Sequence, residues 1–306
     1  MNKVERVRAA LAGAPVDRVP ASFWFHFTPD KSRGLASVRA HLDYYREAGL
    51  DYLKVMNEHP YQSNVPIRDP QDWRRVRPAP IGASFYQEQL DELKRIVDAI
   101  QGECLVITTL FGPFASGNHA SNHQVTEHLK QDADAVTGGL AAIADSLAEF
   151  AVACVDVGAS GIYYSAQGGE ADRLSQELFE TALKPADLVV LNAVARCGEF
   201  HLLHICGERI RLELYADYPG HAVNWAVSKH DLGLQEGRAL FGRTVVGGMD
   251  NRGVIVDGSP EAIRRAVRQL ITDSGTEGII LGADCTLPTD ISVRNIRTAV
   301  ESAWMA

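Results

Sequence analysis

The chain has 306 residues, of which 46% are hydrophobic and 23% are charged, and its formal net charge is -9. This composition is typical of a globular enzyme, and an acidic balance without a block of Lys or Arg excludes nucleic acid as an expected partner. No apolar run approaches the length of a membrane span, and MNKVERVRAALAG lacks the apolar core of a signal peptide. We therefore expect a cytoplasmic protein without a membrane segment. The odd number of cysteines, five, indicates no disulfide framework.

The first elements alternate between helical and strand patterns. The N-terminal segment predicts an amphipathic helix with Val4, Val7 and Leu11 on one stripe. VPASFWFHF (19–27) then predicts the first strand, a helix follows near 37–48, and DYLKVMN (51–57) predicts the second strand.

The same alternation continues to the middle of the chain. A helix pattern at 85–102 precedes ECLVITTLFG (103–112), the third predicted strand. The segment 111–124 is rich in Gly, Ser, Asn and His, and it predicts a long loop of the kind that forms a lid. Helical sequence follows over 125–157.

Five more strand candidates occupy the second half. They are GIYYSAQ (161–167), FHLLHICG (200–207), HAVNWAV (221–227), RTVVGGMD (243–250) and EGIILGADC (277–285). Before the last of them, SPEAIRRAVRQLITDSG predicts a helix with Ser259 as N-cap and Pro260 at the first helical position. A helix near 293–304 closes the chain.

Eight strand and helix repeats in a chain of this length predict an α/β fold, a single (β/α)8 barrel over 1–306. The alternative is a doubly wound open sheet, but no GxGxxG follows the first strand and no P-loop is present.

Active sites of such barrels lie at the carboxyl ends of the strands. The polar, thiol and aromatic residues at these ends are His26, Asn57, Glu58, Tyr163, Tyr164, Ser165, Gln167, His204, Cys206, Asn224, Trp225, Asp250, Asn251, Asp284 and Cys285.

The stretch HLLHICGER places His204 and Cys206 two residues apart on one predicted strand, where their side chains share a face. Cys285 ends the last predicted strand, so all three residues can converge across the mouth of the barrel. One nitrogen and two sulfurs suit Zn²⁺ and leave a fourth position open. A packed core pair and a Cys–His nucleophile are the alternatives that these residues leave open.

Several segments resemble the uroporphyrinogen decarboxylase superfamily. They are RVRAALAGAPVDRVP, LLHICG, VNWAV, DLGLQEGRALFGRTVVGGMDN, EAIRRAVRQLI and GIILGADCTLPTDISVRNIRTAVES. The resemblance covers essentially the whole chain, most firmly 200–306, and implies a (β/α)8 barrel.

Two branches of that superfamily can be distinguished. True decarboxylases carry an arginine-rich RQAGRY-like segment after the first strand and an Asp at the end of the second. This chain has FWFHFTPDKSRG and Asn57 there instead. The other branch consists of zinc-dependent methyltransferases that act with corrinoid proteins, and its zinc-thiol members carry H-x-C and a distant Cys. His204, Cys206 and Cys285 match that motif.

The resemblance therefore implies Zn²⁺ held by His204, Cys206 and Cys285, with Glu58, Asp284, water or substrate as the fourth ligand. It implies a corrinoid (cobalamin) on a separate corrinoid-binding protein that docks at mouth loops including 111–124, and it is consistent with a homodimer.

Three further residues are predicted to be catalytic. Asn57 stands where decarboxylases place their Asp, Tyr164 lies in the region of a substrate-contacting Tyr, and Asp250 lies in a loop over the site. A packed tyrosine and a loop cap are the alternatives for Tyr164 and Asp250. The expected function is a zinc-dependent methyltransferase that moves a methyl group between a corrinoid protein and a small-molecule thiol or methoxy substrate. A metal-free decarboxylase-like lyase is the alternative.

Overall fold

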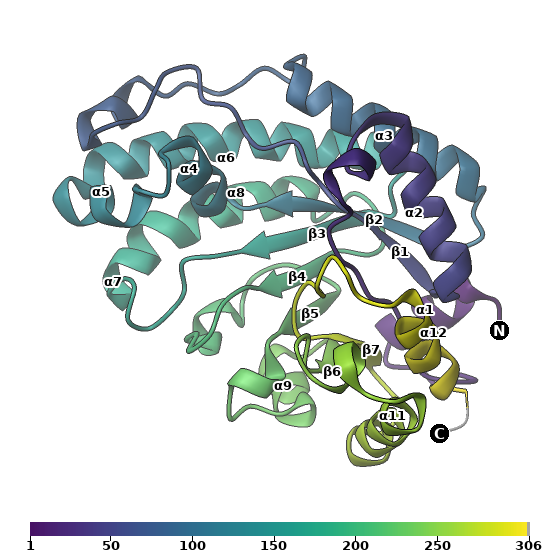
Figure 1. Ribbon diagram of the computed structural model, residues 1–306. Coiled ribbons are helices and arrows are strands. Elements are labelled where there is room, and N and C mark those ends of the chain that lie inside the picture. The colour runs from purple at the N-terminus through teal and green to yellow at the C-terminus, as the bar shows by residue number, and fades with distance from the viewer. Residues whose placement is uncertain (305–306) are drawn as a thin grey trace.

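The computed structural model describes residues 1–304 and contains a seven-stranded parallel sheet (Figure 1). Each strand pairs in parallel with the next along the chain. The strands are β1 (Tyr52–Val55), β2 (Leu105–Phe111), β3 (Gly161–Ala166), β4 (Leu202–Ile205), β5 (Ala222–Trp225), β6 (Thr244–Met249) and β7 (Ile279–Ala283). They lie within the segments predicted as the second to eighth strands, which confirms the α/β class.

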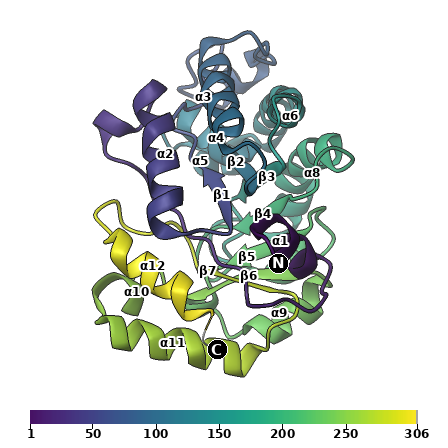
Figure 2. The same cartoon turned by 90° about the vertical axis from the view of Figure 1, so that its right-hand side faces the viewer.

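Helices cover the outer side of the curled sheet, while α1 lies across the amino ends of the strands (Figure 2). Ser259 caps α11 as predicted, because its hydroxyl accepts a hydrogen bond from the Ala262 N–H. The helices are α1 (Lys3–Leu11), α2 (Gly34–Ala48), α3 (Ser84–Ile100), α4 (Pro113–Ala120), α5 (Val125–Gln131), α6 (Ala133–Asp156), α7 (Gln176–Leu178), α8 (Lys184–Val194), α9 (Leu234–Phe241), α10 (Val254–Asp257), α11 (Pro260–Ser274) and α12 (Val293–Ser302).

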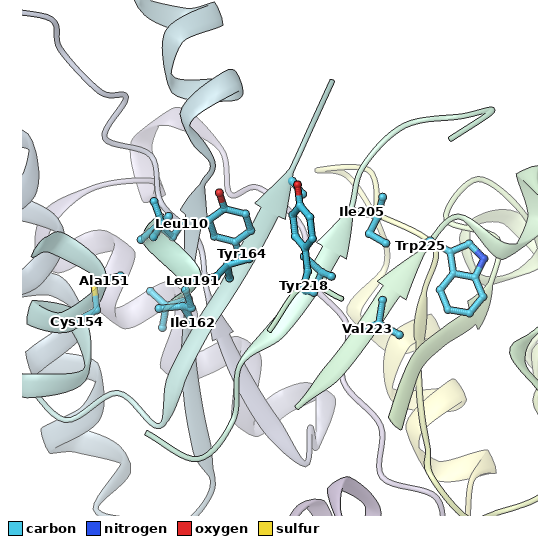
Figure 3. Packing of buried hydrophobic residues seen from close by; sticks show 14 of the residues in the cluster. Leu110, Ala151, Cys154, Ile162, Tyr164, Leu191, Ile205, Tyr218, Val223 and Trp225 are labelled. Atoms are coloured by element: carbon cyan, nitrogen blue, oxygen red, sulfur yellow. The ribbon is translucent and has the colours of Figure 1, made fainter. Parts of the chain in front are cut away.

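Alternation along the strands divides the buried apolar side chains into an inner and an outer cluster. The inner cluster lies on the concave side of the sheet and includes Tyr52, Met56 and Tyr163, with Val7 of α1 at its base. The outer cluster packs between the sheet and the helices, and part of it is shown in Figure 3.

The predicted first strand, 19–27, is not a strand, so the expected eight-stranded barrel is wrong in this element. Its backbone meets β7 only at isolated bridges, one of which pairs Ala21 with Leu281. On the β1 side, one backbone bond from the Asp51 N–H to the Ala21 carbonyl remains, and side chains supply the others: the Ala21 N–H donates to Asp51 Oδ2, and Ser22 Oγ donates to the Tyr52 carbonyl. Pro20 has no N–H to donate. Within residues 1–304, β1 and β7 therefore remain the two edges of a seven-stranded sheet.

The predicted lid-like loop 111–124 instead contains α4, and the helical region after it divides into α5 and α6. Pro113 begins α4, a position that needs no backbone donor, and Phe114 is buried. Gly117 packs against Trp73 so closely that a Cβ would lie 2.9 Å from the indole ring. Close packing therefore holds α4 where its polar composition had indicated an irregular loop.

Contrary to the expectation of no such segment, α6 is long and apolar enough to span a membrane by length and composition alone. Half of its most apolar window is buried in the structure. It packs on α8, α4 and the short 3₁₀ helix Pro70–Arg75. In this structure α6 is therefore packed as a core helix of the outer layer.

A buried ion network stands where the chain joins the start of β1. The Asp51 carboxylate is fully buried and accepts hydrogen bonds from Arg6 at 2.8 Å and from Arg18 at 2.7 and 2.8 Å. It also accepts the Ala21 N–H at 2.7 Å. One side chain thus ties α1 and the segment 19–27 to β1.

Asp51→Asn is expected to lower the free energy of unfolding by about 3–5 kcal/mol, because the buried Arg18 loses its carboxylate partner and the buried Arg6 keeps only Asp17. Urea unfolding followed by circular dichroism measures this change. Asp98→Asn is the control, since Asp98 forms only an exposed pair with Lys94 on α3. An equal effect of the two substitutions would contradict the role given to Asp51.

Candidate metal centre

The β4 strand presents His204 on the inner face of the sheet, with Ser165 of β3 and Asn224 of β5 as its register partners. Cys206 lies just after the strand and still donates its N–H to the Ala166 carbonyl at 2.9 Å, so it keeps the alternation of β4. Gly207 follows with φ +122°, a conformation that L side chains rarely adopt. The chain therefore turns directly after Cys206 has been placed beside His204.

Cys285 reaches the same place from β7. The Asp284 N–H donates to the Met249 carbonyl and continues the pairing with β6. The Cys285 Sγ lies 3.5 Å from His204 Nε2. The donor atoms of His204, Cys206 and Cys285 all lie within 4.8 Å of one another. The structure thus brings together the three residues that were predicted to bind a metal.

Asn224 determines which nitrogen of His204 is free. Its Nδ2 donates to the Val246 and Ala283 carbonyls at 2.7 and 3.1 Å, which leaves Oδ1 as an acceptor. Oδ1 lies 2.5 Å from His204 Nδ1, so the proton of the neutral imidazole is on Nδ1. The lone pair of Nε2 then faces the cysteines, as metal ligation by a histidine requires.

The two thiols differ in acidity because they interact. Hydrogen bonding with Cys206 lowers the pKa of Cys285 well below that of an ordinary thiol, and the nearby His204 contributes in the same direction. The same hydrogen bond, followed by burial, raises the pKa of Cys206. The hydrogen bond between the two thiols therefore moves their pKa values in opposite directions.

This donor set fits zinc. Bonds of about 2.3 Å to sulfur and about 2.1 Å to nitrogen in a tetrahedron separate the two ligand atoms by about 3.6 Å. The observed separation between Cys285 Sγ and His204 Nε2 is 3.5 Å. Three protein donors leave one tetrahedral position for another ligand.

The carboxylates considered as fourth ligands are outside this group among residues 1–304. Glu58 lies 2.5 Å from the half-exposed His26, to which it is paired. Asp284 accepts the Ser228 N–H through Oδ2, and its buried Oδ1 has no partner in the described chain.

Two predicted catalytic residues hold turns at the ends of their strands. Asn57 follows β1 and accepts the His59 N–H through its own side chain at 2.9 Å. Asp250 follows β6 and accepts the Arg252 N–H at 2.9 Å. Both side chains are half-buried and neither belongs to the donor group.

Tyr164 faces the helices, and it is not brought together with the donor group. Its hydroxyl donates to Asp187 Oδ1 of α8 at 2.5 Å, and Tyr218 donates to Oδ2 of the same carboxyl at 3.0 Å. Its neighbour Tyr163 faces inward and stacks on His204, with ring centroids 5.1 Å apart at 22°. The alternation of β3 places Tyr163, and not Tyr164, at the site.

Sequence reasoning assigned no role to three residues around the donors. Tyr163 and Asn224 were recognised only as strand-end residues, and Lys54 was not considered. Lys54 is buried on β1, with Nζ 4.1 Å from the centre of the Tyr163 ring. The signal for Lys54 was present, because a lysine within the apolar run of DYLKVM requires an explanation.

Comparison with known proteins gave one family and several solved structures. The model of the family described as uroporphyrinogen decarboxylase (URO-D) matches residues 46–304. A methyltransferase from Methanosarcina mazei is 17% identical with a TM-score of 0.78, covering 99% of this chain and 98% of that chain. The comparison with curated proteins found no match.

Two methionine synthase structures are also similar. A B12-independent methionine synthase from Shewanella sp. W3-18-1 in complex with selenomethionine is 14% identical, with a TM-score of 0.61 over 94% of this chain and 92% of that chain. A putative vitamin-B12-independent methionine synthase from Listeria monocytogenes is 12% identical, with a TM-score of 0.57 over 87% and 84%. At such identities these likenesses establish the fold.

The Asp187 carboxyl is expected to make stability depend on pH. Burial raises its pKa from 3.8 to about 7. Between these values the folded state keeps a proton that the unfolded state has released, so stability falls as pH rises through this range and then levels off. Urea unfolding at several pH values should show a smaller decline in Asp187→Asn than in the wild type. Parallel curves for the two proteins would contradict this assignment.

Proposed function

The chain belongs to the uroporphyrinogen decarboxylase family, and from this membership and its donor group we propose that it is a zinc-dependent methyltransferase. It transfers a methyl group between a corrinoid and a small-molecule thiol or methoxy substrate. The observation that carries the proposal is the convergence of His204 Nε2 with the sulfurs of Cys206 and Cys285 at the carboxyl ends of the strands. The overall fold shared with a methyltransferase supports the same reading.

His204, Cys206 and Cys285 would hold the zinc ion. When bound, Zn²⁺ supplies a Lewis acid that stabilises a thiolate or polarises a substrate oxygen at the open position. Asn224 keeps the Nδ1 proton of His204 in place and so keeps Nε2 free. The stacked Tyr163 ring limits rotation of the imidazole and excludes water from that side. The chain's own residues thus hold the donors in position before any ligand arrives.

We place the corrinoid on a separate cytoplasmic protein that approaches the carboxyl edge of the sheet. The loop at the end of α4 lies on this side, because α4 directly follows β2 (Figure 1). His119, Asn122 and His123 of this segment are exposed, whereas its first turn is buried. The exposed end of 111–124 is therefore the part that is proposed to dock.

Purified wild-type protein is expected to contain about one zinc ion per chain, because three matched donors converge. Elemental analysis of protein grown without added metal measures it. The double variant Cys206→Ser and Cys285→Ser should lose the metal, while Cys197→Ser, which removes a half-buried thiol outside the donor group, should keep it. A wild-type protein that binds no zinc, even after reconstitution, would exclude this function and favour metal-free decarboxylation.

Asn224→Ala is expected to weaken zinc binding about 10–100-fold, because His204 loses the partner that holds its tautomer and orientation. Competition with a chromogenic chelator measures the affinity. Asn295→Ala is a matched control, since Asn295 also donates Nδ2 to two backbone carbonyls, those of Ile255 and Val256, outside the donor group. If both variants bound zinc like the wild type, Asn224 would have no part in the metal site.

A further inference from the structure

Lys54 is a buried cation on the inner face of β1. Its exposed fraction is 3%, and it lies between Tyr52 and Met56, which belong to the inner cluster. Its Nζ lies 3.0 Å from Met56 Sδ and 4.1 Å from the centre of the Tyr163 ring. Within residues 1–304, Lys54 contacts a thioether sulfur and an aromatic ring and forms no salt bridge with a carboxylate.

An ammonium group in such surroundings lacks the anion that would stabilise it. Burial lowers the pKa of Lys54 to about 7, whereas Cys285 and Glu58 act in the opposite direction from a distance. Trp24, also in the inner cluster, has a buried indole N–H without an acceptor in the described chain. The Lys54 Nζ lies 5.4 Å from the Trp24 ring. Among residues 1–304, the Trp24 indole N–H therefore lacks an acceptor, and the Lys54 ammonium has only the weak thioether acceptor of Met56.

One aromatic ring separates Lys54 from the donor group. Tyr163 receives the Lys54 ammonium on its ring and stacks on the His204 imidazole. Because the intervening groups are buried and apolar or aromatic, charge at the donor group acts on Lys54 with little screening by water.

The net charge of a zinc ion together with its ligands suggests a role for Lys54. Two thiolates balance a zinc dication, so a neutral fourth ligand leaves the centre neutral and an anionic one leaves it with a charge of about -1. We propose that Lys54 is a positioning residue whose ammonium offsets this extra charge, so that the open position selects an anionic ligand over a neutral one. This inference rests on the proposed function, and it favours an acceptor that binds as an anion.

Cobalt-substituted protein provides a test that does not depend on turnover, because Co²⁺ bands in the visible spectrum report the exchangeable ligand. Thiocyanate serves as the anionic probe and pyridine as the neutral probe, each titrated at neutral pH. Lys54→Met should weaken thiocyanate binding on the order of tenfold and leave pyridine binding unchanged. Lys54→Arg should restore most of the preference for thiocyanate. Lys94→Met, which removes an exposed lysine of α3, should bind both probes as the wild type does.

The outcomes separate this inference from the function on which it rests. A wild-type protein that takes up no cobalt would overturn both. Normal cobalt uptake with equal thiocyanate binding in the wild type and in Lys54→Met would overturn only the role of Lys54. So would a loss of pyridine and thiocyanate binding in equal measure, because that result indicates a structural role. If Lys54→Met took up no cobalt, Lys54→Gln would take its place in the comparison.

Discussion

The hydrogen bond between His204 and Asn224 depends on the parallel register of β4 with β5, and the rest of the site depends on that bond. The register sets these residues side by side on the inner face, and a slip of one residue would turn both toward the helices. Asn224 can serve as acceptor because its amide nitrogen is committed to the carbonyls of Val246 and Ala283. Backbone groups of β6 and β7 thus determine the protonation of a side chain on β4.

Most of the sheet could be predicted because buried parallel strands read as short apolar runs separated by helical patterns. The exception, 19–27, has the same apolar character but combines isolated backbone bridges with side-chain hydrogen bonds. Asp51 accepts the backbone N–H that a strand partner would have accepted, and no local pattern reveals such a substitution. Similarly, the polar composition of 111–124 did not predict α4, because the placement of this helix depends on contact between Gly117 and Trp73, which is distant in the sequence.

The donor group could be predicted because His204 and Cys206 lie two apart on one strand and the family motif supplies Cys285. The same parity, applied to β3, distinguishes Tyr163 from Tyr164 only once the register is known: Ser165 pairs with His204, so Tyr163 shares the inner face. The adjacent pair of tyrosines gives no such information by itself. Lys54 required still more, since its meaning depends on which residues surround it and on their charge.

A chain of packed residues connects the ion network around Asp51, at the amino ends of the strands, with the donor group at their carboxyl ends. Asp51 holds the segment 19–27 against β1, and this segment carries Trp24 onto the inner face. Trp24 packs edge-on against Tyr163, with ring centroids 5.2 Å apart, and Tyr163 stacks on His204. Because isolated backbone bridges and the Asp51 side chain, rather than a continuous ladder, hold 19–27, the packing beneath His204 depends in part on a buried ion network at the opposite end of the strands. The Trp24 and Tyr163 rings thus stand in series between the ion network at the base and His204 at the mouth, and the Lys54 ammonium lies against both rings.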